Sequence, residues 1–185
     1  MTCIVALKAA DGSVLMGADS AGVGGYSVQA RVDPKIYRVG SMLIGFTTSF
    51  RMGQLLGYSL SAPDHHADVT VERYMATAFV DAVRACLKAG GYAKKDSEVE
   101  SGGVFLVAYR GRIFEIESDY QVGERVEPYS AVGCGVDLAL GSLFTSAGLI
   151  HEPRARVMKA LETAATYSAG VRAPFLIEEL KAVTE

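Results

Sequence analysis

Short apolar runs with turn signals between them make up the first quarter of the chain. Residues 3–8 and 13–18 are two such runs, separated by an Asp-Gly turn, and residues 35–39 and 42–46 are two more. Runs of this length predict buried strands, and the first two predict a hairpin. The glycine-rich residues 21–25 lack a phosphate-binding spacing, so we expect a flexible or closely packed loop there.

Helical spacing then replaces the short runs. It is weak over residues 50–60 and strong over residues 71–87, where apolar side chains recur at i, i+3 and i+4 until two glycines end the pattern. Further elements are predicted in the order strands, helices, strand: strands at residues 103–109, 112–117 and 129–132, helices at 136–147 and 153–167, and a strand at 174–180.

The order of these elements predicts a single α+β domain over residues 1–185. Strands and helices form separate blocks, and two sheets faced by two helical pairs would give a four-layer αββα sandwich. With 185 residues, half of them hydrophobic, the chain can bury one sizeable core. The polar residues 93–101 are expected to form a surface loop.

Charge and composition narrow the range of partners. The chain has 18 Lys and Arg against 21 Asp and Glu and no basic run, so we expect neither nucleic acid nor a membrane surface as a partner. Because the N-terminus lacks a secretory pattern and no apolar run reaches about 18 residues, a cytoplasmic location is predicted.

The cysteines and histidines indicate no metal, cofactor or disulfide site. The three cysteines form no CxxC pair. The histidines are expected at the solvated surface. The residues concerned are Cys3, Cys86, Cys134, His65, His66 and His151.

Thr2 is the first candidate for chemistry. A hydroxyl is a weak nucleophile unless a base takes its proton, and a free N-terminal amine on the same residue can be that base. The small side chain of Thr2 permits removal of Met1, which would free this amine. The alternative interpretation is an ordinary strand residue, because Met-Thr starts are common.

Lys35 and Asp19 are candidates to assist Thr2. A nearby cation disfavours protonation of an α-amine, whose ordinary pKa is about 7.7–8.0, and so leaves more of it basic. Lys35 can supply the cation, and Asp19, at the end of the second predicted strand, can pair with it if the lysine is buried. A turn carboxylate and a solvated lysine are the alternatives.

Four ordered segments carry a family resemblance: Thr2 opening a short apolar strand, Gly17-Ala18-Asp19-Ser20, Lys35-Ile36-Tyr37-Arg38-Val39 and Met42-Leu43-Ile44-Gly45-Phe46. In order and spacing they resemble the catalytic half of proteasome β subunits and of the bacterial HslV-type peptidase. The resemblance continues through residues 131–135 to residues 173–180. It implies the αββα sandwich of N-terminal nucleophile hydrolases.

The resemblance implies a role for each matching catalytic position. Thr2 would be the nucleophile and its amine the general base, and Asp19 and Lys35 would form a buried ion pair. The backbone N–H of Gly45 would stabilise the oxyanion.

The resemblance also implies a substrate and partners. Val23 and Thr47 would pair with an extended peptide substrate in strand-like fashion. Family members assemble into stacked hexameric or heptameric rings that enclose the active sites, and an ATP-dependent unfoldase supplies extended substrate. The resemblance therefore implies a homo-oligomeric ring for this chain. No cofactor is implied.

The chain departs from the family at several positions. Cys134 stands where the family usually has a serine, and a thiol is a weaker hydrogen-bonding group, so its support for the Thr2 amine is expected to be poorer. Cys134 as a catalytic thiol is disfavoured because no histidine is placed to activate it. The family's Asp near the end of the penultimate helix has no counterpart, since Thr166 and Ser168 occupy that region. Residues 47–51 also stand in place of the glycine-rich and acidic residues that usually follow the oxyanion loop in the family.

Three functions are therefore considered. The first is a threonine-type endopeptidase of a proteasome-like, self-compartmentalising protease. The second is an inactive ring-forming subunit, as proteasome α subunits are. The third is an amidohydrolase of the same fold acting on a small molecule. It would need polar or charged residues around the loop after Asp19, whereas Ala21, Val23 and Val32 suggest apolar surroundings suited to peptide side chains.

Overall fold

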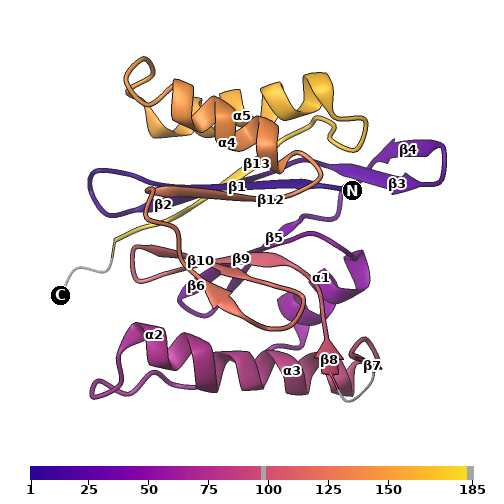
Figure 1. Cartoon of the computed structure of the whole chain (residues 1–185), viewed down its shortest axis with the longest axis vertical. Coiled ribbons are helices and arrows are strands. Elements are labelled where there is room, and N and C mark those ends of the chain that lie inside the picture. The colour runs from indigo at the N-terminus through magenta and orange to yellow at the C-terminus, as the bar shows by residue number, and fades with distance from the viewer. Residues whose placement is uncertain (97–98, 183–185) are drawn as a thin grey trace.

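Two β-sheets lie face to face between two layers of helices (Figure 1). This computed structural model describes residues 1–96 and 99–182. Helices α4 (Val136–Thr145) and α5 (Pro153–Tyr167) cover the first sheet, while α1 (Phe50–Tyr58), α2 (Val71–Tyr74) and α3 (Val80–Ala89) cover the second. The predicted αββα sandwich is confirmed.

The first sheet has the order β12-β1-β2-β13, and all its neighbours are antiparallel. In this register Cys3 pairs with Gly133, and Ile4 pairs with Ala18. The strands that the apolar runs predicted are all present, within two residues at each end. Their bounds are β1 (Cys3–Lys8), β2 (Val14–Ala18), β12 (Tyr129–Gly133) and β13 (Leu176–Leu180).

The second sheet has the order β11-β10-β9-β6-β5 and is also antiparallel. Its central strands β6 and β9 are buried along their whole length, because one face meets the first sheet and the other meets helices. The bounds are β5 (Ile36–Val39), β6 (Met42–Phe46), β9 (Phe105–Tyr109), β10 (Arg112–Ile116) and β11 (Val122–Gly123).

Three apolar clusters fill the three spaces between the four layers. Ile4 and Leu43 belong to the cluster between the sheets, Leu161 to the cluster under α4 and α5, and Phe79 to the cluster between the second sheet and its helices. Phe79 ends a π-helical turn, η1 (Met75–Phe79), that joins α2 to α3. The single helix predicted over residues 71–87 is therefore continuous but locally wider.

Two short hairpins lie where loops were expected. β3 (Ala21–Gly24) and β4 (Ser27–Ala30) form one, and Gly25, with φ of 57°, makes its tight turn. In the other, β7 (Lys94–Asp96) pairs antiparallel with β8 (Val99–Ser101). The first hairpin projects beside the N-terminus (Figure 1), so this correction bears directly on the site.

His65 also differs from expectation. It is half-buried rather than solvated, its ring nitrogens lie 2.9 Å from the Tyr109 hydroxyl and 2.7 Å from the Val69 carbonyl, and it stacks on Tyr74. These contacts give it a structural role in the loop before α2.

Within residues 1–96 and 99–182, no helix combines the length and the apolar character that crossing a membrane requires.

Candidate functional site

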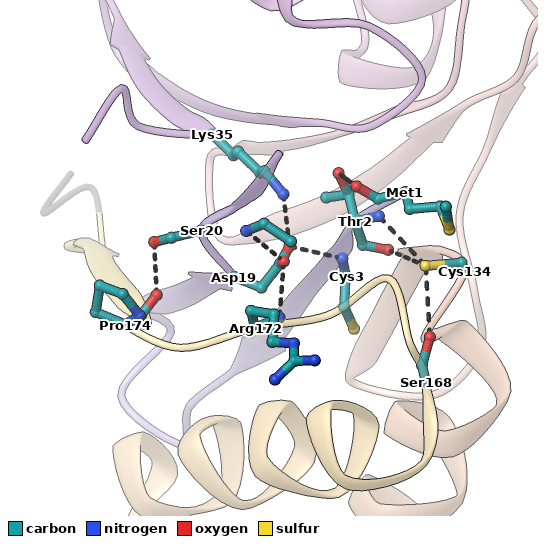
Figure 2. Close-up of polar contacts among 11 residues, drawn as sticks. Met1, Thr2, Cys3, Asp19, Ser20, Lys35, Cys134, Ser168, Arg172 and Pro174 are labelled. Atoms are coloured by element: carbon teal, nitrogen blue, oxygen red, sulfur yellow. Dashed lines mark hydrogen bonds and ion pairs between the residues drawn. The ribbon is translucent and has the colours of Figure 1, made fainter. Parts of the chain in front are cut away.

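Four strand ends bring Thr2, Asp19, Lys35 and Cys134 close together (Figure 2). Thr2 immediately precedes β1, Asp19 follows β2, Lys35 precedes β5 and Cys134 follows β12. Because β1 pairs with both β2 and β12, the register alone places Thr2 beside Cys134 and close to Asp19.

Asp19 is the centre of a buried polar network. Its Oδ1 accepts a hydrogen bond from Lys35 Nζ at 2.8 Å and from the Cys3 N–H at 3.0 Å. Its Oδ2 accepts the N–H groups of Ala21 at 2.9 Å and Arg172 at 3.2 Å. Four donors therefore compensate a carboxylate that is 2% exposed.

Lys35 is as deeply buried as its partner, with 1% of its surface exposed. Burial lowers the pKa of Lys35, and the charge and hydrogen bond of Asp19 oppose that shift. A buried lysine paired with one carboxylate is costly to maintain for stability alone, which makes this pair a candidate functional group.

Cys3 lies beside the network but is not a plausible nucleophile. Burial, together with the negative charge of Asp19, raises the pKa of its thiol to about 12. A thiol with that pKa stays protonated at neutral pH and is unreactive.

Thr2 contacts Cys134 through its backbone. The Thr2 N–H lies 3.3 Å from Cys134 Sγ, and the thiol is 3.4 Å from the Thr2 carbonyl oxygen. The Thr2 hydroxyl donates to the Met1 carbonyl at 2.5 Å. Cys134 thus holds the nitrogen that becomes an amine once Met1 is removed.

Gly133 permits this close approach. Its φ is 100°, and a Cβ at this position would lie 2.2 Å from the Thr2 carbonyl oxygen. Only a glycine fits there.

Two residues near the site had no predicted role. Ser168, just after α5, donates its hydroxyl to Cys134 Sγ at 3.5 Å, and the backbone N–H of Arg172 binds Asp19. Thr166 instead bonds its own helix at Glu162. The sequence gives a hint of Ser168, because it lies in the region where the family has an Asp. It gives none of Arg172, because a contact made by a backbone N–H does not depend on the residue type.

The prediction that Gly45 supplies an oxyanion donor is not supported. Gly45 lies inside β6, and N–H groups alternate along a strand. The Phe46 N–H donates to Lys35 on the β5 side, and the Thr47 N–H donates to Val104 on the β9 side. The Gly45 N–H therefore also points along the sheet toward β9.

A pocket of 530 Å³ opens beside Thr2. It is lined by Met1 and Thr2, by the β3–β4 hairpin with Arg31, and by residues 46–50. Val23 and Thr47, the predicted substrate-contact residues, both line it.

The backbones of these two residues differ in availability. Gly24 and Ser27 close the two-residue turn and exchange hydrogen bonds, so the next pair, Val23 and Val28, does not. The N–H and C=O of Val23 therefore point outward from the hairpin. In contrast, the Thr47 N–H donates to the Val104 carbonyl, and the Thr47 carbonyl accepts from the Ser49 N–H, so neither group is available.

Thr48 lies at the rim of the pocket in an unusual conformation. Its φ is 60°, in the left-handed region that few threonines adopt. In the described part of the chain its backbone N–H has no hydrogen-bond partner, whereas the neighbouring N–H groups of Thr47 and Ser49 do.

Two residues expected to shape the pocket lie elsewhere. Ala21 is buried, and Val32 is fully exposed to solvent. Across residues 1–96 and 99–182 there is also no group of three or more His, Cys, Asp or Glu that could hold a metal ion.

Comparison with known proteins identifies the fold. No protein-family model and no curated protein matches the sequence. The structure is similar to BPH from Thiobacillus denitrificans, with 20% identity, a TM-score of 0.81 and coverage of 99% of this chain and 100% of that one. The same protein in complex with epoxomicin gives 19% identity, a TM-score of 0.79 and coverage of 98% and 100%.

A third solved structure is the eukaryotic HslV from Trypanosoma brucei, with 15% identity, a TM-score of 0.69 and coverage of 97% of this chain and 99% of that one. The chain has the HslV-type fold. The resemblance drawn from the four sequence segments is thereby confirmed as a likeness of fold over nearly the whole chain. In this HslV-type fold Thr2 lines the pocket, and the next residue, Cys3, hydrogen-bonds to Asp19 of the buried ion pair.

Proposed function

We propose that the chain is a threonine-type peptidase whose nucleophile is Thr2 after removal of Met1. The observation that carries this proposal is the buried pair of Lys35 and Asp19 directly against the first strand. Asp19 binds the N–H of Cys3, the residue next to Thr2, with the same oxygen that binds Lys35. The lysine therefore places a positive charge close to the N-terminal residue, where it favours the neutral, basic form of the amine.

In the proposed reaction, the Thr2 amine takes the proton of its own hydroxyl as Oγ1 attacks the substrate carbonyl carbon. The tetrahedral intermediate collapses to an ester on Oγ1, and the leaving amine departs with the proton. Water, deprotonated by the same amine, then hydrolyses the ester and restores Thr2.

We assign the oxyanion contact to the Thr48 N–H in place of Gly45. Thr48 lines the same pocket as Thr2, and its N–H is not used within the described residues. Backbone donors fixed before the reaction stabilise a developing oxyanion most effectively.

The substrate is proposed to bind as an extended peptide along the outer edge of β3. Val23 offers both an N–H and a C=O to such a strand. By analogy with the fold, we also propose a homo-oligomeric stacked ring in the cytoplasm, served by an ATP-dependent unfoldase. Sedimentation of the purified chain tests the ring.

A second candidate function is amide hydrolysis on a small molecule. The polar and charged residues that this function requires after Asp19 are present, because Ser27, Gln29 and Arg31 line the pocket and Ala21 and Val32 do not. Cleavage of single amino-acid amides but not of longer peptides would favour this candidate over the peptidase.

Intact mass spectrometry with a peptide epoxyketone, a reagent for N-terminal threonine, tests the proposal. We expect the purified chain to lack Met1 and to gain one inhibitor mass, with the adduct mapped to Thr2. A chain that keeps Met1 and gains no mass would instead support the inactive ring-forming subunit.

Replacing Cys134 by serine should raise the rate of peptide hydrolysis. A hydroxyl hydrogen-bonds the Thr2 nitrogen better than a thiol, and a gain of about 0.5–1.5 kcal/mol corresponds to about 2- to 10-fold in kcat. Cys134→Ala should lower the rate, because the contact is lost.

Alkylation gives an independent check on the position of Cys134. Iodoacetamide should inactivate the wild type and spare Cys134→Ser, since Cys134 is exposed while Cys3 is buried and Cys86 is half-buried. Equal inactivation of both proteins would contradict the placement of this thiol beside Thr2.

A further inference from the structure

Arg31 contributes an unexpected positive charge to the pocket. Among the described residues that line the pocket, it is the only one with a charged side chain. It follows β4, and its backbone N–H donates to the Ser20 carbonyl at 2.8 Å, which fixes the end of the hairpin. Its neighbour Val32 points into solvent, so the side chain that enters the pocket is cationic rather than apolar.

The Arg31 side chain is held in place before any ligand binds. Its aliphatic part crosses Gly22, where an added Cβ would lie 2.5 Å from Arg31 Cδ. Its guanidinium lies over the ring of Phe50, 4.0 Å from the centroid, in a cation–π contact. An arginine fixed on two sides loses little conformational entropy when it binds a ligand.

The guanidinium keeps unused donors. Its Nε and Nη2 both donate to Asp33 Oδ2, with 2.9 Å for the Nε contact. A guanidinium has five N–H donors, so three have no partner in the part of the chain that is described. Asp33 does not line the pocket, and the pocket wall carries no carboxylate among the described residues.

We propose that Arg31 selects substrates with an acidic side chain, glutamate or aspartate, on the acyl side of the bond that Thr2 attacks. This inference rests on the proposed peptidase function, in which Thr2 is the nucleophile. Thr2 and Arg31 line the same pocket, so a peptide bound at Thr2 can present a side chain to Arg31. A carboxylate matches the forked geometry of the guanidinium, whereas a lysine side chain would meet a like charge.

Fluorogenic peptides that differ only in the residue before the scissile amide test the selection. We expect kcat/KM for glutamate to exceed that for glutamine by about 10- to 100-fold, as charge-assisted hydrogen bonds allow, and lysine to be the poorest. Arg31→Gln should remove the difference between glutamate and glutamine, and Arg31→Glu should favour lysine.

Two further variants separate the position of the charge from its presence. Gly22→Ala keeps the guanidinium but displaces its stem, so it should weaken the preference for glutamate. Arg73→Gln removes an exposed arginine outside the pocket and should leave the preference unchanged.

Peptide binding to the Thr2→Ala variant, followed by fluorescence anisotropy, gives a readout that needs no turnover. If glutamate peptides bind more tightly than glutamine peptides, and Arg31→Gln abolishes this difference, the selection is supported. If in addition no peptide is cleaved by the wild type, only the peptidase proposal fails. Thr2-dependent cleavage with a leucine preference that Arg31→Gln leaves intact would overturn the selection and keep the peptidase. Equal binding of all peptides would also overturn it.

Discussion

Thr2→Ala should reduce peptide hydrolysis by at least about 10⁴-fold, because no hydroxyl remains to form the ester. Thr2→Ser should retain measurable activity, since serine supplies the same hydroxyl and the same amine. The melting temperature should change little, because within the described residues the Thr2 hydroxyl hydrogen-bonds only to the carbonyl of Met1, which the proposed processing removes. Initial rates on a fluorogenic peptide, with a thermal melt of each variant, measure both effects.

A matched control for this variant is Thr145→Ala. The Thr145 hydroxyl is exposed, and among the described residues it bonds only to carbonyls of its own helix, at Gly141 and Ser142, so the wild-type rate is expected. If Thr2→Ala kept the wild-type rate, the nucleophile would lie elsewhere and the proposed function would fail.

Removing the buried charge of Lys35 should affect both rate and stability. In Lys35→Met the amine of Thr2 loses the neighbouring cation that favours its basic form, and we expect kcat to fall by about 10²- to 10⁴-fold. Asp19 is left buried without its counter-charge, which should cost about 3–5 kcal/mol of unfolding free energy. Urea unfolding and steady-state kinetics on the same preparations measure the two losses.

The double variant Asp19→Asn/Lys35→Met separates the two effects. It removes both charges, so much of the stability should return while the rate stays low. Lys159→Met provides the surface control, because Lys159 is exposed and pairs only loosely with Glu162 at 3.7 Å. Recovery of the full rate by the double variant would show that Lys35 acts only by compensating Asp19.

The strands and helices of the sandwich could be predicted because its layers cover one another. β1 and β6 are buried on both faces and so appear as continuous apolar runs. The β3–β4 hairpin was missed for the opposite reason: all four residues of β4 are exposed, and no apolar pattern marks them. Without that hairpin, the sequence could not show whether Arg31 or Val32 enters the pocket.

The sequence predicts the part of the site made by side chains at strand ends. It does not predict the part that depends on where backbone N–H groups point. Thr2, Asp19 and Lys35 meet because the strands they adjoin are neighbours across the sandwich. A glycine at position 45 suits an oxyanion donor by residue type, but its position in β6 directs its N–H along the sheet. Thr48 has the available N–H, and no side-chain rule for a threonine indicates a φ of 60°.

The bond between Asp19 and Lys35 joins the two halves of the protein, since one residue follows a strand of the first sheet and the other precedes a strand of the second. Neither half holds all of the groups proposed to act in catalysis. In the proposed peptidase, a newly made chain whose sheets have formed but not yet stacked would therefore lack a working centre until its own assembly is finished.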